Sequence, residues 1–546
     1  MKKKNKKAAG SGSGSNAAGN TGSSGSASKK TENTAVKEQK MNIREKFTNL
    51  YLLSLFSLFP IFMTKKLFHV RTDRLYFFIT ATIALLVLTA GAYIFGKDKK
   101  HLRTVYQMSV SDWSFIAFTG ICLISAIFSS YGEAAFTGSG GRNSGFLLMA
   151  VYLLSYFLIS RNFRYIEEIF TFFAIMSSVI CFIAVLNEFN IDPFALISVI
   201  SKSQQKDFIT TIGNINTFSG FVCVSLPICI IMSVMTKKTV LRIIYLAAAG
   251  INMTGLIVGN SLSGFFAFLC VITLLFVYCC KSMEKLFGYF LTLSVLLISI
   301  KLLRLFSYIH QDKYKNLSDI SKYLVYDNIV YILIIIAAIL TATTFLLSKR
   351  SEGKELPRYI RYIAGGVVGL AWGALLFIFI YFSFIDTKTD LGSFATVLRL
   401  NDKWGTHRGY AWIRSIYLLR SNGLKNFLIG SGPDTFGQMM KASFNADMIK
   451  RHGKVFDSAH NEFLHYLVTT GVTGVAAYIS LIVTILYRCI KRCKDKIPFL
   501  IVIFVIISYC SQSLFNVATP IITPYIFVFL GIAEGLLRNN DAKKAL

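Results

Sequence analysis

Residues 217–259 read TFSGFVCVSLPICIIMSVMTKKTVLRIIYLAAAGINMTGLIVG, and this stretch decides the fold class. Two apolar runs, 217–235 and 240–259, lie on either side of the short basic loop KKTVLR. About 20 apolar residues suffice for a helix to cross the hydrocarbon core of a bilayer, where every backbone polar group must be satisfied within the segment. The stretch therefore predicts two membrane-spanning helices joined by a short loop.

The same alternation continues along the whole chain. Its 546 residues are 54% hydrophobic and 16% charged, with a mean hydropathy of +0.54, which excludes a cytoplasmic enzyme. We expect an all-α, polytopic membrane protein with about fourteen transmembrane helices. The predicted spans are 48–63, 75–95, 113–130, 145–160, 166–187, 217–235, 240–259, 264–280, 286–302, 326–347, 362–385, 461–488, 498–516 and 521–537.

The formal net charge of +30 comes mostly from Lys and Arg in the loops between the apolar runs. Cationic loops stay in the cytoplasm, so this excess indicates membrane topology and not nucleic-acid binding. With the N-terminus inside, residues 64–74 are the one basic turn on the outer side. The ten cysteines lie almost entirely in apolar runs, which argues against a disulfide framework, and Cys489 and Cys493 have no second pair of metal ligands nearby.

The chain divides by composition into a tail and a membrane domain. Residues 1–46 are rich in Gly, Ser and Lys and predict a disordered basic tail that contacts anionic lipid headgroups. Residues 47–546 form the predicted membrane domain, and within it residues 386–459 are the one long extracytoplasmic segment. This segment carries eleven Lys and Arg against six Asp. A cationic outer segment favours an anionic ligand, so we expect the chemistry there.

Ionisable side chains at membrane depth would indicate a transporter. No Asp or Glu lies near the middle of any predicted span. This disfavours a proton-coupled carrier. A glycolipid flippase needs a cationic cavity more than a carboxylate relay, so it stays open as the alternative from another functional class.

Two motifs lie in and at the end of the outer segment: THRGYAWIRSIYLLRSNGLKNFLIGSGPDTF at residues 406–436 and DSAHNEFLHYLVTTGVTG at residues 457–474. Both resemble the O-antigen ligase and O-antigen polymerase superfamily. Its members show an Arg four residues before a Trp, then a Gly-x-Gly turn, then His-Asn-x-x-Leu and a Gly-x-x-Gly pair. The matching residues, in the same order and spacing, are Arg408, Trp412, Gly430, Gly432, His460, Asn461, Leu464, Gly471 and Gly474.

The resemblance extends upstream to GGRNSG around Arg142 and to IGNINTFSGF around Asn214 and Asn216. It implies that these three residues bind substrate. One departure concerns the head of a mid-chain span, where family members often carry a Ser-Arg pair. This chain has NSLSGFF there, with Leu262 in the arginine position. Arg142 or a loop lysine is expected to bind phosphate in its place.

The resemblance implies a bacterial cytoplasmic-membrane glycosyltransferase. Such an enzyme moves a glycan from undecaprenyl diphosphate to an acceptor hydroxyl on the outer face, and it needs no cofactor, metal or nucleotide sugar. Ligases and polymerases share these motifs, so the acceptor stays open: a lipid, a protein, a teichoic-type polymer or the growing glycan. A diphosphate is already a good leaving group, whereas the acceptor hydroxyl needs a base near neutrality, which is the range of histidine.

His460 is the expected base. Ser458 is expected to cap the helix that follows, which places His460 in the first turn, where the positive helix end favours a neutral imidazole. The alternative is that His460 only helps to cap the helix. Asn461 is expected to bind substrate beside it. His465 lies five residues further on, so the two histidines do not form the four-apart pair of a zinc-binding helix.

Arg408 is expected to bind the diphosphate, because a guanidinium offers a permanent cation with two-pronged geometry. Trp412 shares its predicted helix face and is expected to contact substrate. The alternative is an arginine that only anchors the helix at the membrane interface. Arg414, on another face, is a further substrate-binding candidate. The GSGPD turn at residues 430–434 could present backbone amides to phosphate, although a purely structural turn is the better-supported interpretation.

Overall fold

The computed structural model describes residues 41–96, 107–139, 141–309, 317–421, 423–453 and 455–545. Asn42–Leu546 form one compact unit. Among the described residues the regular secondary structure is helical, apart from one antiparallel hairpin of two short strands, β1 (Phe208–Ile209) and β2 (Gly213–Asn214), and an isolated bridge between Ser282 and Glu355. The prediction of an all-α protein is therefore confirmed. The predicted tail of residues 1–46 lies outside the described residues as far as residue 40.

The helices follow one another along the chain, and a longer connection with the β1–β2 hairpin joins Glu188 to Ile215. Their bounds are α1 (Ile43–Ser57), α2 (Val70–Phe95), α4 (Val110–Ile127), α5 (Glu133–Thr137), α6 (Phe146–Asn162), α7 (Glu167–Glu188), α8 (Ile215–Met235), α9 (Thr239–Val258), α10 (Leu262–Cys279), α11 (Met283–Ile309), α12 (Asp319–Tyr326), α13 (Ile329–Ser351), α14 (Arg358–Ile380), α15 (Ala395–Leu398), α16 (Trp404–Ser421), α17 (Gly423–Ile429), α18 (Phe436–His452), α19 (Glu462–Arg492), α20 (Ile497–Ser513) and α21 (Thr523–Ala545). Shorter helical turns are Lys66–Phe68, Gln205–Asp207, Gly392–Phe394 and the wide turn Tyr381–Ile385 that continues α14.

Ten of the described helices are long and apolar enough to cross a membrane, and α6 and α20 are shorter apolar helices. The protein is thus a multi-pass membrane protein. Every predicted span overlaps a helix, but the number of about fourteen that cross the bilayer stays a prediction. The first predicted span, 48–63, matches least well, because α1 ends at Ser57.

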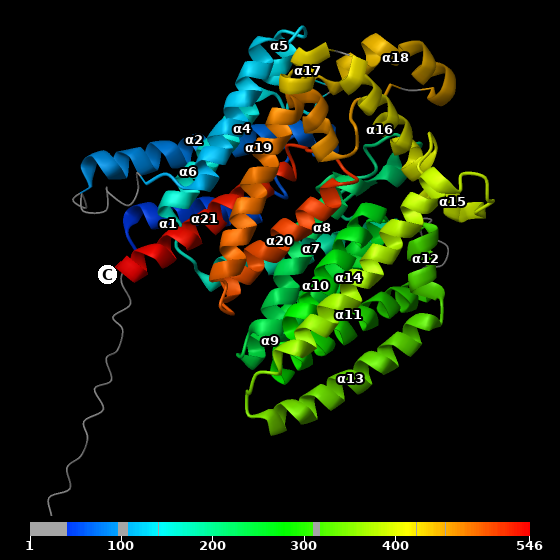
Figure 1. The fold of residues 1–546 in the computed structure, drawn as a ribbon. Helices are drawn as coiled ribbons and strands as arrows, with labels where there is room; N and C mark the ends of the chain where they lie inside the picture. The colour runs from blue at the N-terminus through cyan, green and yellow to red at the C-terminus, as the bar shows by residue number, and fades with distance from the viewer. Residues whose placement is uncertain are drawn as a thin grey trace, which may run out of the picture. The chain divides into compact units, whose positions relative to one another are not determined.

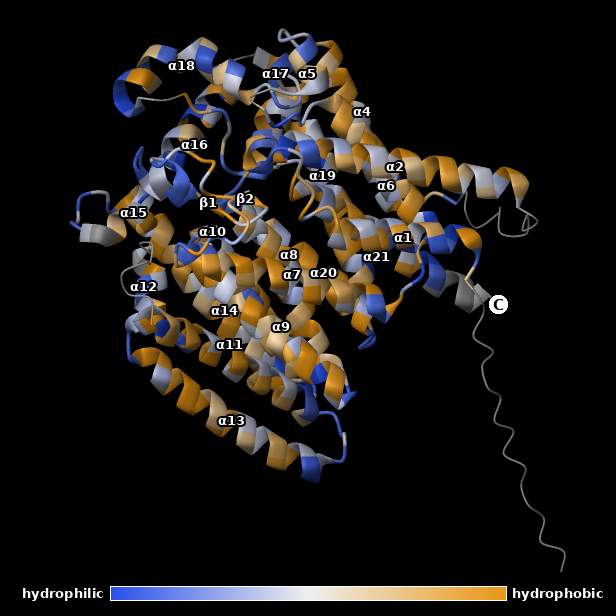
Figure 2. Ribbon diagram, turned by 180° about the vertical axis from the view of Figure 1, so that it is seen from behind, coloured by the Kyte–Doolittle hydropathy of each residue, from blue (hydrophilic) through white to orange (hydrophobic). Residues whose placement is uncertain are grey.

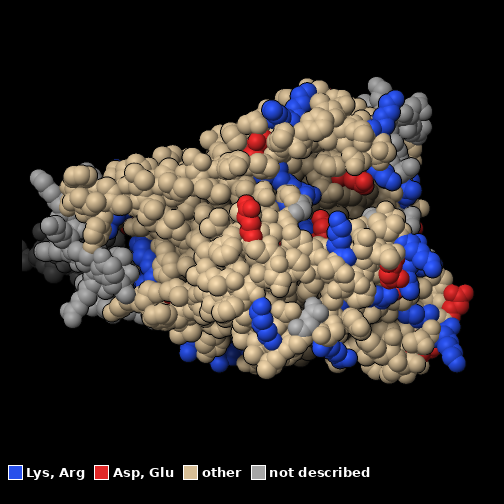
Figure 3. All heavy atoms as spheres, turned by 90° about the horizontal axis from the view of Figure 1, so that it is seen from above, with Lys and Arg blue, Asp and Glu red and all other residues tan. Residues whose placement is uncertain are grey.

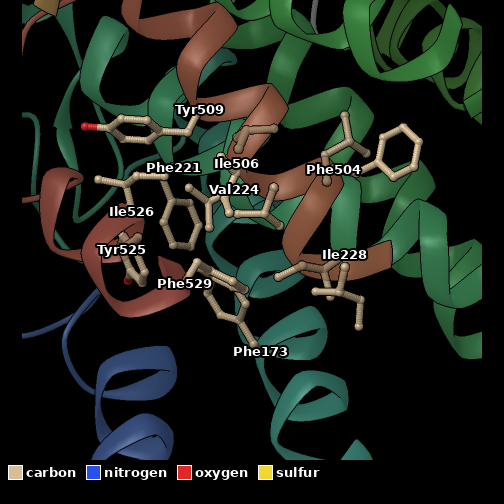
Figure 4. Close-up of a cluster of buried hydrophobic side chains, with 14 of the residues drawn as sticks. Phe173, Phe221, Val224, Ile228, Phe504, Ile506, Tyr509, Tyr525, Ile526 and Phe529 are labelled. Atoms are coloured by element: carbon tan, nitrogen blue, oxygen red, sulfur yellow. The ribbon is translucent and has the colours of Figure 1, made fainter. Parts of the chain in front are cut away.

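The core of the membrane domain lies around α8, which is buried at almost every position. Aromatic and branched side chains of α7, α8, α20 and α21 point toward one another there (Figure 4). The Phe173 ring lies 5.9 Å from both the Phe221 ring and the Tyr525 ring. By contrast, α13 and α14 lie at the edge of the bundle, and their exposed apolar side chains are those expected to face lipid (Figure 1).

The basic turns predicted to be cytoplasmic lie together at one end of the bundle, as far as the structure describes them. Ion pairs link neighbouring turns and helix ends at this end. They are Arg164–Glu45, Lys237–Glu284, Lys238–Glu167, Lys281–Glu355, Lys281–Asp495 and Arg538–Asp112. The other end carries α15 to α18 and is called the α16 end below (Figure 1). Hydrophilic residues are frequent on α16 and α18, whereas the long helices are largely apolar (Figure 2).

The exceptional basic turn of residues 64–74 also lies at the α16 end. Arg74 is fully buried there, and its guanidinium donates to the backbone carbonyls of Pro60, at 2.8 Å, and Thr211, at 3.0 Å. Its charge is thus compensated by the dipoles of neighbouring carbonyl groups, which explains how a cation of this turn is accommodated on the predicted outer side. Viewed onto this end, Lys and Arg side chains gather mainly over the half that carries α15 to α18, mixed with a few acidic side chains (Figure 3).

Candidate functional site

The site is built where α16 meets the segment that leads into α19. Regular helical geometry in α16 begins at Arg408, because the three preceding residues, Gly405, Thr406 and His407, have positive φ angles. One turn further on, the indole N–H of Trp412 donates to the backbone carbonyl of Ala459 at 2.9 Å. This bond brings the first motif of the sequence to the residue directly before His460.

The segment around His460 differs from the sequence prediction in its helix cap. Ser458 does not cap α19: its buried hydroxyl has no hydrogen-bond partner among the described residues. The cap is Asn461, whose side chain accepts the backbone N–H of Leu464, and the helix begins at Glu462. His460 therefore lies before the helix and not in its first turn, with a left-handed φ of +48°.

Arg142 binds Asp457, three residues before His460. It is only 4% exposed, and its guanidinium contacts two carboxylates, Asp434 at 3.3 Å and Asp457 at 3.1 Å. It also donates to the backbone carbonyl of Asp457. Asp434 in turn accepts the backbone N–H groups of Ser139, at 2.9 Å, and Ser144, at 3.1 Å. The loop around Arg142 is thereby held against the residues that precede His460.

The two carboxylates beside Arg142 have different environments. Burial raises the pKa of Asp434, and Arg142 and the two backbone N–H groups offset this only in part. Burial would also raise the pKa of Asp457, but the charge and hydrogen bond of Arg142 outweigh it, so the pKa is lowered. The Asp457 side chain is 52% exposed, against 1% for Asp434. Asp457 is thus the carboxylate of this pair that solvent reaches.

The glycine motifs form the contact between the GSGPD turn and a break in α19. Gly471 interrupts α19 with a φ of +73°, and a Cβ there would lie 2.2 Å from the carbonyl oxygen of Leu428. The backbone N–H groups of Ser431 and Gly432 donate to carbonyls of α19, at 3.3 and 2.9 Å. Since these two amides bind the protein itself, the structural interpretation of the turn is supported over the phosphate-binding one.

Two arginines of α16 differ sharply in their partners. The half-buried guanidinium of Arg408 forms no hydrogen bond and no ion pair within the part of the chain that the structure describes, and burial lowers its pKa. Arg414 instead pairs with Asp402 at 3.2 Å and Asp447 at 3.6 Å, and stacks over the Tyr410 ring. Arg408 is therefore the cation that has capacity for an anionic ligand.

The upstream asparagines lie at the same end of the bundle, joined to α16 through the α20–α21 connection. Asn214 caps α8, and its side chain accepts the backbone N–H of Asn216 at 3.0 Å. The side-chain oxygen of Asn216 accepts a hydrogen bond from the hydroxyl of Ser261, which directly precedes Leu262 at the start of α10. The backbone carbonyl of Asn216 accepts a hydrogen bond from the side-chain amide of Asn516 at 3.1 Å.

A stacking contact between two aromatic rings links the α20–α21 connection to α16. Phe515, directly before Asn516, stacks nearly parallel to Trp412, with ring centroids 6.3 Å apart. Among the described residues, no hydrogen bond joins Arg408 to Arg142, Asn214 or Asn216.

No group of three or more His, Cys, Asp or Glu that could hold a metal occurs among the described residues. His465 lies inside α19, is buried, and its Nε2 is 4.0 Å from Asp434. Its ring packs on Phe436. His465 thus belongs to the packing behind the Arg142 ion pairs.

Comparison with known proteins concerns the second half of the chain. Residues 323–479 match the family model described as O-antigen ligase. This region is similar to the O-antigen ligase superfamily. It contains Arg408, Trp412, Arg414, His460 and Asn461, whereas the Arg142 loop and the upstream asparagines lie outside it. No curated protein matches the chain.

Together with the apolar helices, the match indicates a membrane enzyme of the O-antigen ligase or polymerase type. Two residues of the candidate site were missed by sequence reasoning, Asp434 and Asp457. Both lie within the quoted motifs, and an Asp directly after the Gly-x-Gly-Pro turn was the available signal. A third is Arg71 in the first turn of α2, whose charge interacts with Arg142 and Asp457.

Proposed function

We propose that the protein transfers a glycan from undecaprenyl diphosphate to an acceptor hydroxyl at the outer face of the bacterial cytoplasmic membrane. The observation that carries the proposal is the bond from Trp412 to Ala459. It brings the helix of Arg408, a half-buried cation without a partner among the described residues, to the residue before His460. The proposed phosphate-binding group and the proposed base thus lie on segments joined by this bond.

In the proposed reaction His460 takes the proton of the acceptor hydroxyl as its oxygen attacks the anomeric carbon of the donor. The bond between that carbon and the diphosphate oxygen breaks, and the diphosphate leaves with the electron pair. Arg408 stabilises the negative charge on the leaving group through two parallel hydrogen bonds. The proton then passes from His460 to solvent. Asn461 supports the base by capping α19 directly after it.

The acceptor is a hydroxyl of a lipid, a protein or a glycan, and a polymerase that extends the growing glycan uses the same chemistry. The second candidate function is a glycolipid flippase, which is favoured by the basic residues of the α16 end (Figure 3). A flippase moves the lipid-linked glycan without releasing undecaprenyl diphosphate, so the two functions leave different products.

His460→Ala tests the proposal in membranes that contain the native donor and acceptor. We expect release of undecaprenyl diphosphate to fall by about 10²-fold or more, with donor accumulating on the outer leaflet. The matched control is His69→Ala, because His69 is an exposed histidine at the same end of the bundle. Unchanged release in the His460 variant would exclude His460 as the base. No release by the wild type, with donor accumulating on the inner leaflet in the variant, would favour the flippase. Addition of a chelator should leave release unchanged, and inhibition reversed by a divalent ion would contradict the metal-free chemistry.

A further inference from the structure

His460 has a backbone conformation that is uncommon for a residue other than glycine. Its φ of +48° lies in the left-handed region, where the Cβ of a non-glycine residue crowds the backbone. Such a conformation persists only where neighbouring contacts hold it, and residues with strained backbones are frequent at functional sites. The question is which residues hold His460.

Three residues, Arg142, Trp412 and Asn461, hold the chain on both sides of His460. Before it, Arg142 binds both the carboxylate and the carbonyl of Asp457, and Trp412 donates to the carbonyl of Ala459. After it, Asn461 caps α19. Of these contacts, the one from Trp412 reaches the peptide group that directly precedes His460.

The Trp412 ring itself is held in place. It stacks on Phe515 with an angle of 9° between the ring planes, and lies 4.8 Å from the Trp404 ring. A fixed indole presents its N–H in one direction, so it can fix the carbonyl that accepts it. We infer that Trp412 is a positioning residue for His460: its N–H holds the Ala459 peptide so that the imidazole is presented to the acceptor hydroxyl. The inference rests on the proposed function and replaces the substrate contact expected from the sequence for Trp412.

The chain contains a matched control for this bond. Trp404 donates its own indole N–H to a backbone carbonyl, that of Val397, at 2.8 Å. Trp404→Phe and Trp412→Phe therefore each remove one N–H donor from the same pair of packed rings and keep an aromatic side chain. Only Trp412→Phe removes a bond to the segment that carries His460.

The test measures initial rates of undecaprenyl diphosphate release against donor concentration for the full-length protein. Trp412→Phe should lower kcat by roughly 10-fold to 100-fold, because a small displacement of a catalytic group costs this much, and should leave KM within about twofold. Trp404→Phe should stay near the wild-type rate. Equal rates for the two variants would overturn the inference, and a raised KM with unchanged kcat would make Trp412 a substrate-binding residue.

A double variant separates positioning from general damage to the fold. In the His460→Ala background Trp412→Phe should cause no further loss of rate, because there is no base left to position. A further loss as large as in the wild-type background would refute the inference. If His460→Ala itself keeps full activity, the proposed function fails instead, so the two failures are distinguishable.

A second variant covers the case in which Trp412→Phe does not fold. Benzothienylalanine at position 412 keeps the size and shape of the indole and replaces only the N–H by sulfur. It should lower kcat in the same way and should raise the rate of backbone hydrogen exchange around Ala459, whereas the same replacement at Trp404 should change neither. Wild-type kcat and exchange in the position 412 variant would overturn the inference.

Discussion

Asn461 accepts the backbone N–H of Leu464 through its side-chain oxygen at 2.9 Å, and this bond sets the first residue of α19. The proposed base, one residue earlier, is consequently outside the helix but directly at its N-terminal end. Unpaired N–H groups of the first turn give this end a partial positive charge, and the charge of Asp457 also acts on His460. The neutral imidazole expected from the sequence therefore stays a prediction.

The left-handed backbone of His460 predicts an unusual order of stability among its variants. His460→Ala and His460→Gly should both lose transfer by about 10²-fold, because both remove the base. The glycine variant should nevertheless be more stable than the alanine variant by about 1 kcal/mol, since only glycine adopts a positive φ freely. Thermal unfolding of the purified proteins measures this difference.

The control for that order is Lys441, an exposed residue within α18. There the alanine variant should be the more stable one, by about 1 kcal/mol, because glycine is a poor helix former. If alanine were also favoured at position 460, the backbone of His460 would not have the left-handed conformation, and the positioning argument built on it would fail.

Arg408 offers a test of anion binding. If Arg408 binds a diphosphate through two parallel hydrogen bonds, Arg408→Lys should lower the transfer rate nearly as much as Arg408→Ala. The ammonium of lysine keeps the positive charge but cannot form two parallel hydrogen bonds. Transfer rates in both variants measure this. The control is Arg420→Lys, an exposed arginine in the last turn of the same helix. Full activity of Arg408→Lys would reduce Arg408 to an anchor at the membrane interface.

The sequence sufficed for the helical architecture, and it indicated the segments of the candidate site. Apolar runs of membrane length have few alternatives to helices, so the overlap of each predicted span with a helix follows from the bilayer as solvent. The motif order placed Arg408 and His460 in adjoining segments, and the structure brings these segments together through Trp412 and Ala459.

The partners of the charged residues could not be predicted, because they come from distant parts of the chain. Arg142 and Asp434 are 292 residues apart, and nothing local distinguishes a buried ion pair from a free phosphate-binding arginine. The prediction that Ser458 caps α19 was wrong for a related reason. Ser458 and Asn461 are both good capping residues, and the backbone contacts of Asp457 and Ala459 decide between them.

The alternation of basic turns predicts the orientation of the protein in the membrane. A cysteine introduced as Lys425→Cys, in α17, should react with a membrane-impermeant thiol reagent from the outside. A cysteine introduced as Lys494→Cys, between α19 and α20, should react only after the membrane is permeabilised. Labelling in whole cells checks both, in a background where the native cysteines are replaced. Labelling of position 425 only from the cytoplasm would reverse the topology and place the proposed site on the wrong side.

The end of the bundle opposite α16 contains a buried ion network that fastens α21. Arg538 binds both Asp112 of α4 and Glu534 of α21, and the two carboxylate side chains are fully buried. Removing the single partner of a buried charge typically costs about 3–5 kcal/mol. Asp112 keeps its ion pair with Arg161, and Glu534 keeps its ion pair with Arg488, so the loss of Arg538 should cost less than this. Arg538→Ala should still lower the melting temperature, whereas Arg350→Ala, at an exposed arginine of α13, should not. Similar melting temperatures for the two variants would show that the network does not stabilise the fold.

The lowered pKa of Asp457 predicts how acid affects the stability of the protein. Burial alone would raise its pKa, but Arg142 lowers the pKa below the ordinary value, which is about 3.9. Because the folded-state pKa is depressed, the carboxylate stabilises the fold above about pH 4, and this contribution is lost as the pH falls through the folded-state pKa. Asp457→Asn keeps an oxygen that can accept a hydrogen bond from Arg142 but cannot titrate. The wild type should therefore be the more stable protein near pH 6, and its advantage in melting temperature should shrink on acidification toward about pH 3. An advantage that stays constant or grows with acid would mean that Arg142 does not hold Asp457 as a carboxylate.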